Sequence, residues 1–366
     1  MSGTTGKPVR RAPITLFDHA LRLHRASPDR PFAREGQPYP DESVHRGRDS
    51  PEAPADRSLI GEDVARVLDA HFARAAAEPR ELAFSFHKLC LPSHRNEHIA
   101  AAARRADLDR VLRTGRWLVR NGIDSCAVTV GLALLAEVGT TDDIPFIQMI
   151  GLLSAPFGPL AVEALERLPG AAESLLWYAE RVTGWGRVDV VHALSSRDEP
   201  QVRAWLLRRS CDGDFLNSYF AGQVAVHVGL HEELGGLDTD AELVDHIGRI
   251  LYLMHSCDGR GLTLADYPHA AAVLEAHARH VGPLGPTAQR FVTCTLLALQ
   301  LTTKSPQAAG CTEEQHGALR ETYTALLDRD AWIRTAREAL AEEDETMLWL
   351  ARYHGAELGL RAFRSS

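Results

Sequence analysis

Long hydrophobic runs are missing from this sequence. It contains no stretch of about 18 consecutive apolar residues, so no segment predicts a transmembrane helix. The first residues, MSGTTGKPVRRAP, lack the apolar core of a secretory signal, and we therefore expect a cytoplasmic protein. Its six cysteines are scattered and form no CxxC pair, which predicts reduced thiols rather than a disulfide framework.

Familiar catalytic motifs are missing as well. The chain has no GxSxG, P-loop, dinucleotide-binding GxGxxG or HExxH pattern, and no nucleophile stands beside an obvious base. An active site assembled from distant residues stays open, because helical arrays host such sites. Basic residues are also fewer than acidic residues: the chain has 40 Lys and Arg and 49 Asp and Glu, which gives a net charge of −9. That balance disfavours a nucleic-acid partner but leaves room for a local basic patch.

Ala and Leu are abundant, whereas aromatic residues make up only 7% of the chain. This bias favours helices over strands. Residues 61–75 and 108–122 carry apolar side chains at helical spacing, and the second segment ends at Asn121-Gly122, a frequent helix terminus. Residues 126–138 are almost wholly apolar and predict a buried helix. The chain is therefore expected to be all-α.

Residues 140–170 predict two helices joined by a short turn. Thr141 or Asp142 is expected to cap the first helix, with Pro145 in its first turn. Pro159 is expected near the start of the second helix. Such antiparallel helix pairs are the building blocks of α-helical repeat proteins.

Several segments resemble the sequence motifs of HEAT repeats. LAVEAL (160–165) and VRAWLL (202–207) look like second helices of that repeat. More narrowly, the chain resembles bacterial HEAT-repeat proteins with a GWGR segment (184–187), an NSYFA-like segment (217–221) and a closing helical pair (329–360). The resemblance implies a right-handed α-α superhelix closed by a C-terminal helical cap, and no assigned activity.

The composition divides the chain into two regions. Residues 58–366 are expected to form a single HEAT-like domain, preceded by an extended or partly disordered arm over residues 1–57. The arm holds one helix candidate (14–24), followed by a proline-rich stretch that forbids a long helix. It is either a solvated tail or an arm pinned onto the body by Phe32, Pro38 and Tyr39.

Three tryptophans fall in the region most similar to HEAT repeats. Trp177 and Trp205 lie in apolar segments that predict helices, and we expect them to fill the core between repeats. Trp185 stands between two glycines at a helix start, where it either closes a turn or forms an exposed binding aromatic. Arg187 at a helix start is disfavoured by the helix dipole, so we expect Asp189 or Asp198 to hold it.

We expect a non-catalytic scaffold or adaptor that binds a protein or peptide on the concave face of the array. The predicted binding residues are Trp177, Trp185, Arg187, Asp189, Arg203, Arg208, Asn217 and Tyr219. The alternative is an enzyme with its site in the same groove. Its most concrete form is a DNA glycosylase-like repair protein, because some HEAT-like proteins hold damaged nucleotides with aromatic, acidic and Arg side chains.

One histidine-rich segment, residues 87–98, has the composition of a possible metal site. Cys90, His94 and His98 are spaced four residues apart, and His87 precedes them, so a continuous helix would align them for Zn²⁺. Pro92 interrupts that helix, and with 17 histidines such clusters arise by chance. The sequence therefore predicts neither a metal nor a cofactor.

Overall fold

The computed structural model describes residues 13–45, 54–234 and 240–364. All regular structure in these ranges is helical, with no β-strand, so the all-α prediction is confirmed. Among the described helices, none combines the length and apolar character needed to cross a membrane. The chain forms two compact units, Met1–Ala193 (unit 1) and Leu194–Ser366 (unit 2).

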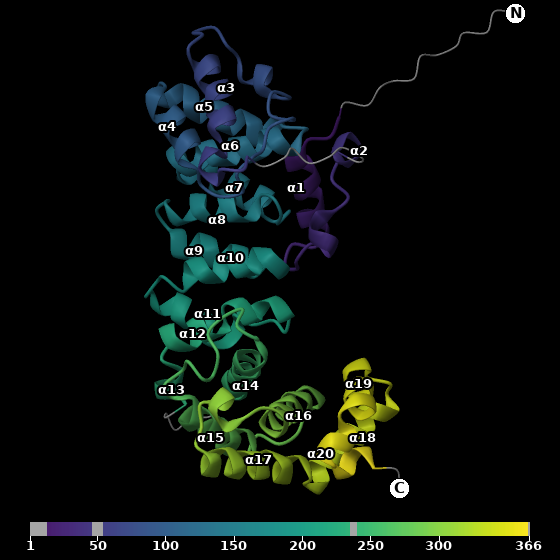
Figure 1. The fold of residues 1–366 in the computed structure, drawn as a ribbon. Coiled ribbons are helices and arrows are strands. Elements are labelled where there is room, and N and C mark those ends of the chain that lie inside the picture. Colours follow the sequence, from purple (N-terminus) through teal and green to yellow (C-terminus); the bar gives the residue numbers. More distant parts are fainter. Residues whose placement is uncertain (1–12, 46–53, 235–239, 365–366) are drawn as a thin grey trace, which may run out of the picture. The chain divides into compact units, whose positions relative to one another are not determined.

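Unit 1 is built from ten α-helices within the described ranges, with short 3-10 turns between them (Figure 1). The helices are α1 (Leu16–Ala26), α2 (Glu42–His45), α3 (Glu62–Phe72), α4 (Glu97–Arg105), α5 (Leu108–Asn121), α6 (Ser125–Val138), α7 (Ile144–Gly151), α8 (Gly158–Glu166), α9 (Ala171–Ala179) and α10 (Gly184–Leu194), the last of which reaches the boundary with unit 2. The 3-10 turns are η1 (Ala33–Gly36), η2 (Arg57–Leu59), η3 (Pro79–Leu82) and η4 (Thr141–Asp143).

Unit 2 holds the remaining described helices. They are α11 (Pro200–Arg209), α12 (Ala221–His227), α13 (Leu230–Glu233), α14 (Ala241–Ser256), α15 (Ala270–Val281), α16 (Ala288–Thr303), α17 (Glu313–Leu327), α18 (Asp330–Ala341), α19 (Glu345–Tyr353) and α20 (Gly355–Leu358). Its 3-10 turns are η5 (Phe215–Tyr219), η6 (Pro306–Ala309) and η7 (Arg361–Phe363).

Several helices begin where a short polar side chain caps them. Asp107 accepts a hydrogen bond from the Arg110 N–H at the start of α5, and Asp124 accepts from two N–H groups at the start of α6. The helices predicted over 61–75, 108–122 and 126–138 are confirmed as α3, α5 and α6. Nearly every side chain of α6 is buried, as its apolar sequence predicts.

The predicted helix pair over 140–170 is present as α7 and α8, with Pro145 and Pro159 in their first turns. The cap differs from the prediction of Thr141 or Asp142. Thr140 and Asp143 form a reciprocal capping box around η4, which leads directly into α7. The Arg116 guanidinium donates two hydrogen bonds to Asp143, of 2.6 and 3.1 Å. This contact explains why Asp143 is the buried carboxylate of the capping box.

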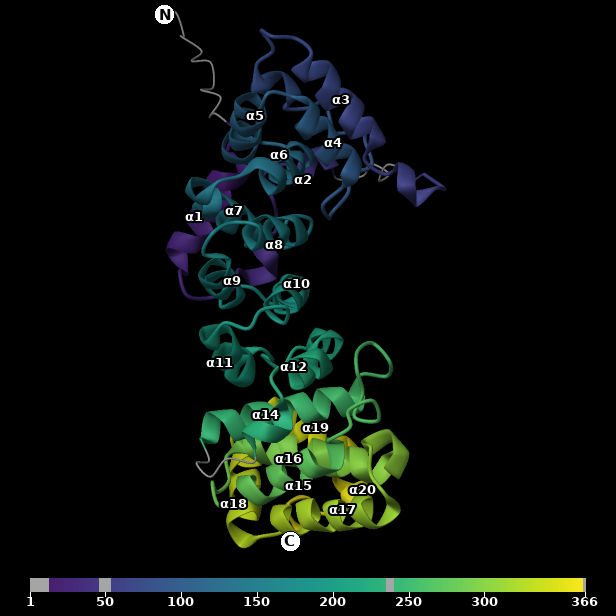
Figure 2. The ribbon, with the colours of Figure 1, turned by 90° about the vertical axis from the view of Figure 1, so that its left-hand side faces the viewer.

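In unit 1, helices α3 to α9 pack mainly against helices close to them in the chain, whereas α1 packs against α7 and α5. α5 lies against α6, α6 and α7 against α8, and α8 against α9 (Figure 2). Gly151 allows α7 to approach its neighbours closely, because a Cβ at this position would lie 2.7 Å from the Cβ of Ala161 and 2.9 Å from the Tyr178 ring.

The N-terminal segment 13–45 packs onto unit 1. Helix α1 lies beside α7 and α5 in both views and buries Leu16 and Ala20 completely (Figures 1 and 2). Phe32 is buried and Tyr39 is bonded to the turn after α7, as the pinned-arm alternative expects, whereas Pro38 is exposed. Residues 1–12 and 46–53 of the predicted arm lie outside the described residues.

Unit 2 is organised around α14 and α16, which pack against each other, with α15 and α17 beside them. The predicted closing pair at the C-terminus is present as α18 and α19, and both helices contact α16. Trp332 of α18 is buried, with its ring 6.5 Å from that of Phe291 in α16. Trp205 of α11 is also buried, as predicted.

Candidate functional site

The eight predicted binding residues are divided between the two units. Trp177, Trp185, Arg187 and Asp189 belong to unit 1, and Arg203, Arg208, Asn217 and Tyr219 belong to unit 2.

In unit 2, both predicted arginines bind acidic side chains of the same unit. Arg203 of α11 donates to Glu233 of α13 at 2.8 Å. Arg208 donates at 2.8 Å to Asp240, the residue that caps α14. These ion pairs link α11 to α13 and to the start of α14, which gives both arginines a structural role.

Asn217 and Tyr219 lie in the 3-10 turn η5. Asn217 is fully buried, and its Oδ1 accepts hydrogen bonds from the backbone N–H groups of Asp212 and Gly213, at 2.8 and 3.2 Å. Burial removes the Asn217 side chain from the surface, and its contacts hold the turn before η5. Tyr219 is half-buried.

In unit 1, Trp177 lies under the N-terminal segment rather than at an open surface. Its ring is 5.6 Å from the ring of His24 in α1, and the Arg181 guanidinium lies 4.3 Å from its centre. Arg181 in turn donates to the carbonyl of Pro28 and to Asp29. Trp177 therefore helps to hold the segment 13–45 in place.

Arg187 is buried, with 7% of its surface exposed. Its guanidinium donates to the carbonyl oxygens of Ala179 and Val182, at 3.1 and 3.2 Å, and so satisfies the end of α9. The sequence predicts Asp189 or Asp198 as the partner of Arg187, and these carbonyl groups are partners that this prediction does not include. Arg187 thus fastens α10 to α9.

Trp185 and Asp189 are one helical turn apart on α10, so their side chains lie on the same face. Trp185 is 49% exposed, which favours the exposed aromatic over the turn-closing plug. Asp189 is half-buried and forms no hydrogen bond or ion pair within residues 13–45, 54–234 and 240–364. An exposed indole thus stands beside an uncompensated carboxylate.

The environment of Asp189 disfavours its charged form. The pKa of this carboxyl is raised to about 6, mainly by burial; His94 acts to lower it, and the negative charge of Glu163 adds to the increase. A carboxylate kept partly desolvated without a cation destabilises its own fold, and such groups concentrate at functional sites.

A second carboxylate, from Glu35 in the N-terminal segment, lies at the start of α10. A Cβ at Gly184 would be 3.2 Å from its Oε1 atom. Burial raises the pKa of Glu35, and its side chain also has no hydrogen bond or ion pair among the described residues. Glu35 is not among the binding residues predicted from the sequence, because only the packing of the N-terminal segment brings it to α10.

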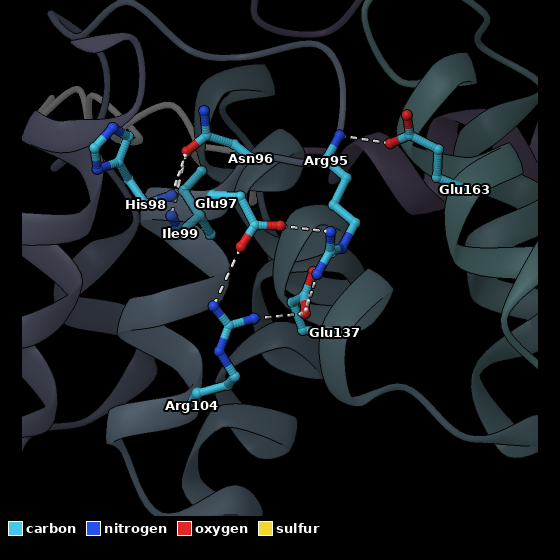
Figure 3. A network of polar contacts seen from close by, with 8 residues as sticks. All are labelled: Arg95, Asn96, Glu97, His98, Ile99, Arg104, Glu137 and Glu163. Atoms are coloured by element: carbon cyan, nitrogen blue, oxygen red, sulfur yellow. Dashed lines mark hydrogen bonds and ion pairs between the residues drawn. The ribbon is translucent and has the colours of Figure 1, made fainter. Parts of the chain in front are cut away.

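A polar network holds Glu163, whose charge acts on Asp189, in a fixed position. Figure 3 shows this network around Glu163. Glu163 of α8 accepts hydrogen bonds from His94, at 3.1 Å, and from the backbone N–H of Arg95, at 2.5 Å. The Arg95 side chain binds Glu137 of α6 at 2.5 and 3.2 Å and Glu97 at 2.7 Å. The network fixes the loop before α4 against α6 and α8, and with it the position of the Glu163 charge.

These residues are suited to hold a cation. Two half-buried carboxylates supply negative charge and form no ion pair among the described residues, and Trp185 is an exposed aromatic side chain of the kind that makes cation–π contacts. A lysine or arginine side chain of a partner has the required charge, and its aliphatic stem would cover the indole.

The histidine-rich segment 87–98 does not form a metal site from Cys90, His94 and His98. His94 is bound to Glu163, and the His98 ring contacts the Ser58 carbonyl at 2.8 Å. Within the described part of unit 1, His45, His87, Asp124 and Cys126 form a group that could hold a metal. Of these four residues, only His87 is among the possible metal ligands named from the sequence.

No family model, curated protein or solved structure matches this chain. The class that the fold defines is an all-α protein of two compact helical units. Its function has to be inferred from the site itself.

Proposed function

We propose that this protein is a non-catalytic scaffold or adaptor of HEAT-like architecture in the bacterial cytoplasm, and that unit 1 binds a basic side chain of a protein partner. The observation that carries the proposal is the exposed Trp185 indole one helical turn from the half-buried, unpaired carboxylate of Asp189. Aromatic side chains beside complementary charge are typical of the residues that dominate protein–protein binding.

The packing order supports the HEAT-like part of the proposal. Within each unit, the main contacts join helices that are near neighbours in the chain. This is the pattern expected when short antiparallel helix pairs stack along an array, each pair burying the face that it cannot bury alone. A right-handed superhelix with a C-terminal cap is the arrangement that the sequence resemblance implies.

The energetics of Asp189 support a cationic ligand. Its raised pKa means that the folded protein pays for the negative charge above pH ~6. A partner's ammonium or guanidinium group would lower the pKa of Asp189 and recover that free energy on binding. Binding should therefore weaken below pH ~6, where the carboxyl is protonated.

The alternative, a DNA glycosylase-like enzyme, would use the same Trp185 and Asp189. It also expects Arg187 and Arg203 at the surface to hold phosphates. Arg187 is instead buried against backbone carbonyls, and Arg203 is paired with Glu233. The net charge of −9 points the same way, so the protein-binding proposal is favoured.

Affinity capture of the tagged full chain from its host's lysate tests the proposal. The matched variants are Trp185→Ala and Asp189→Asn, with Trp349→Ala as a control that removes an equally exposed tryptophan from unit 2. We expect a protein partner with wild type and control, and its loss with both variants at pH 7. Binding should also fall at pH 5.

Other outcomes contradict the proposal. Nucleic acid captured by the wild type and lost with both variants would favour the enzymatic alternative. A partner that both unit 1 variants retain would place the binding surface elsewhere. If the wild type captures neither protein nor nucleic acid, Trp185 and Asp189 do not form a partner site.

A further inference from the structure

Four potential metal ligands from three separate segments meet in unit 1, away from Trp185. His45 ends the short helix α2, His87 follows the turn η3, and Asp124 and Cys126 open helix α6. Their ligand atoms all lie within 4.8 Å of one another. Asp124 is buried and the other three are half-buried.

The distances suit a small cation. Nδ1 of His87 lies 2.9 Å and Nε2 of His45 lies 3.5 Å from the same oxygen, Oδ2 of Asp124. In a tetrahedral zinc site, metal–ligand bonds of about 2.0–2.3 Å place the ligand atoms roughly 3.3–3.8 Å apart. Shifts of about 1 Å would therefore convert this cluster into a four-ligand sphere.

The second oxygen of Asp124 is already engaged. Oδ1 accepts hydrogen bonds from the backbone N–H groups of Cys126 and Ala127, at 3.0 and 3.3 Å, as the cap of α6. This contact orients the carboxylate and directs Oδ2 towards the two imidazoles. Outer contacts of this kind are what hold metal ligands in a fixed geometry.

A second buried carboxylate adds negative charge. Asp41 is 4% exposed and Asp124 is 1% exposed, and the Asp41 carboxylate lies 3.1 Å from Nε2 of His45. Asp41 also accepts a hydrogen bond from the backbone N–H of Ser125, at 2.6 Å. Two buried carboxylates beside one histidine pair form a site of negative charge, which a bound divalent cation would compensate.

The same side chains could suggest a Cys-His-Asp nucleophile, but the thiol is not activated. Burial and the negative charge of Asp124 raise the pKa of the Cys126 thiol to about 12. A reactive cysteine needs the opposite environment, in which positive charge stabilises the thiolate. A bound metal ion would stabilise the thiolate directly, with the proton released to solvent.

We propose that His45, His87, Asp124 and Cys126 bind one Zn²⁺ ion. A mixture of two imidazoles, one thiolate and one carboxylate matches the ligand preference of zinc. All four positions of the metal are then taken by the protein, as in sites that stabilise structure. The ion joins the N-terminal segment, through His45, to the start of α6.

Metal binding to the purified full chain tests this proposal. The protein is stripped with a chelator, supplied with Zn²⁺ or Co²⁺, desalted and analysed by elemental analysis and absorption spectroscopy. We expect one zinc per chain, and with Co²⁺ the visible bands of a four-coordinate ion plus a sulfur-to-cobalt charge-transfer band.

Matched variants identify the ligands. Cys126→Ser should abolish the charge-transfer band and weaken zinc binding at least tenfold in competition with a chromophoric chelator. His45→Ala, whose side chain is one-third exposed, should also weaken binding while leaving the helical circular dichroism unchanged. Cys90→Ser is the control, because Cys90 is half-buried but lies outside the cluster.

Two results would overturn the assignment. The first is a folded wild-type protein that retains no zinc after desalting and shows no charge-transfer band with Co²⁺. The second is zinc binding by the Cys126→Ser and His45→Ala variants that equals the wild type, which would place the metal elsewhere. Neither result bears on Trp185 and Asp189, so this test is independent of the proposed function.

Discussion

The hydroxyl oxygen of Tyr39 lies 2.5 Å from the carbonyl oxygen of Leu153, a residue 114 positions further along the chain. The same hydroxyl is 2.8 Å from the carbonyl of Ala155. Tyr39 thus ties the N-terminal segment to the turn between α7 and α8, where Leu153 is fully buried. This contact and the α1–α7 packing explain how Glu35 reaches the start of α10.

Removal of the Tyr39 hydroxyl should loosen this attachment. We expect Tyr39→Phe to lower the free energy of unfolding by about 1–2 kcal/mol, because the carbonyl of Leu153 loses its partner in a buried environment. Urea denaturation would show a lower midpoint with an unchanged slope. Tyr353→Phe, at a tyrosine that is 60% exposed, should leave the midpoint unchanged. Equal midpoints for all three proteins would contradict the prediction.

The Arg116–Asp143 pair should contribute strongly to stability. Asp143 is fully buried; burial tends to raise its pKa, but hydrogen bonds from Arg116 and Thr140 outweigh this and lower it. Arg116→Met leaves that carboxylate without its charge partner, at a cost of about 3–5 kcal/mol. Arg105→Met, which breaks a surface pair with Asp69, should cost less than about 1 kcal/mol. Chemical denaturation of both variants measures the difference, and similar costs would refute it.

Asp189 should make stability fall as pH rises. Its folded pKa of about 6 lies above the unfolded value of roughly 3.9, so between these pH values the folded state holds a proton that the unfolded state has lost. Asp189→Asn should therefore exceed the wild type by about 1–2 kcal/mol at pH 8, a figure reduced for partial exposure, with the gain vanishing near pH 4.

Thermal unfolding of the Asp189→Asn variant between pH 4 and pH 8 checks this sign. Glu173→Gln, at an exposed carboxylate of α9, is the control and should follow the wild-type profile. A variant that is less stable than the wild type at pH 8 would show that Asp189 has a stabilising partner when charged.

Two glycines should respond to alanine in opposite directions. Gly151→Ala should destabilise unit 1 by about 1–3 kcal/mol, because the added methyl group meets Ala161 and Tyr178 at distances that packing does not allow. Gly317→Ala, within α17, meets nothing within 4 Å and should stabilise unit 2 by about 0.5–1 kcal/mol. Calorimetry of the two variants tests both signs, and destabilisation by Gly317→Ala would be the contrary result.

The helices of this protein are largely predictable because the interactions that start and end them are local. The periodic apolar side chains of residues 108–122 and the Asn121-Gly122 terminus correspond to helix α5. Errors arise where two local choices have similar energies: the cap before α7 is Thr140 with Asp143, because Arg116 from another helix favours that carboxylate.

The candidate site was predictable only in part. Trp185 and Asp189 share one helix, so their proximity follows from helical spacing. For Arg187 the sequence predicts a nearby carboxylate, Asp189 or Asp198, but the carbonyl groups at the end of α9 that it contacts depend on the packing of α10 against α9. Glu35 comes from a segment whose position depends on the packing of α1 against α7.

By itself, the sequence determined the all-α class and the positions of most helices, since these depend on side chains within about four residues of one another. Tertiary structure alone decided which charges are compensated and which are not. It left Asp189 and Glu35 half-buried with no ion pair to any residue that the structure describes, and it brought His87 within 2.9 Å of Asp124 from 37 positions away. Burial and long-range contact depend on how the helices pack, and no local pattern encodes that packing.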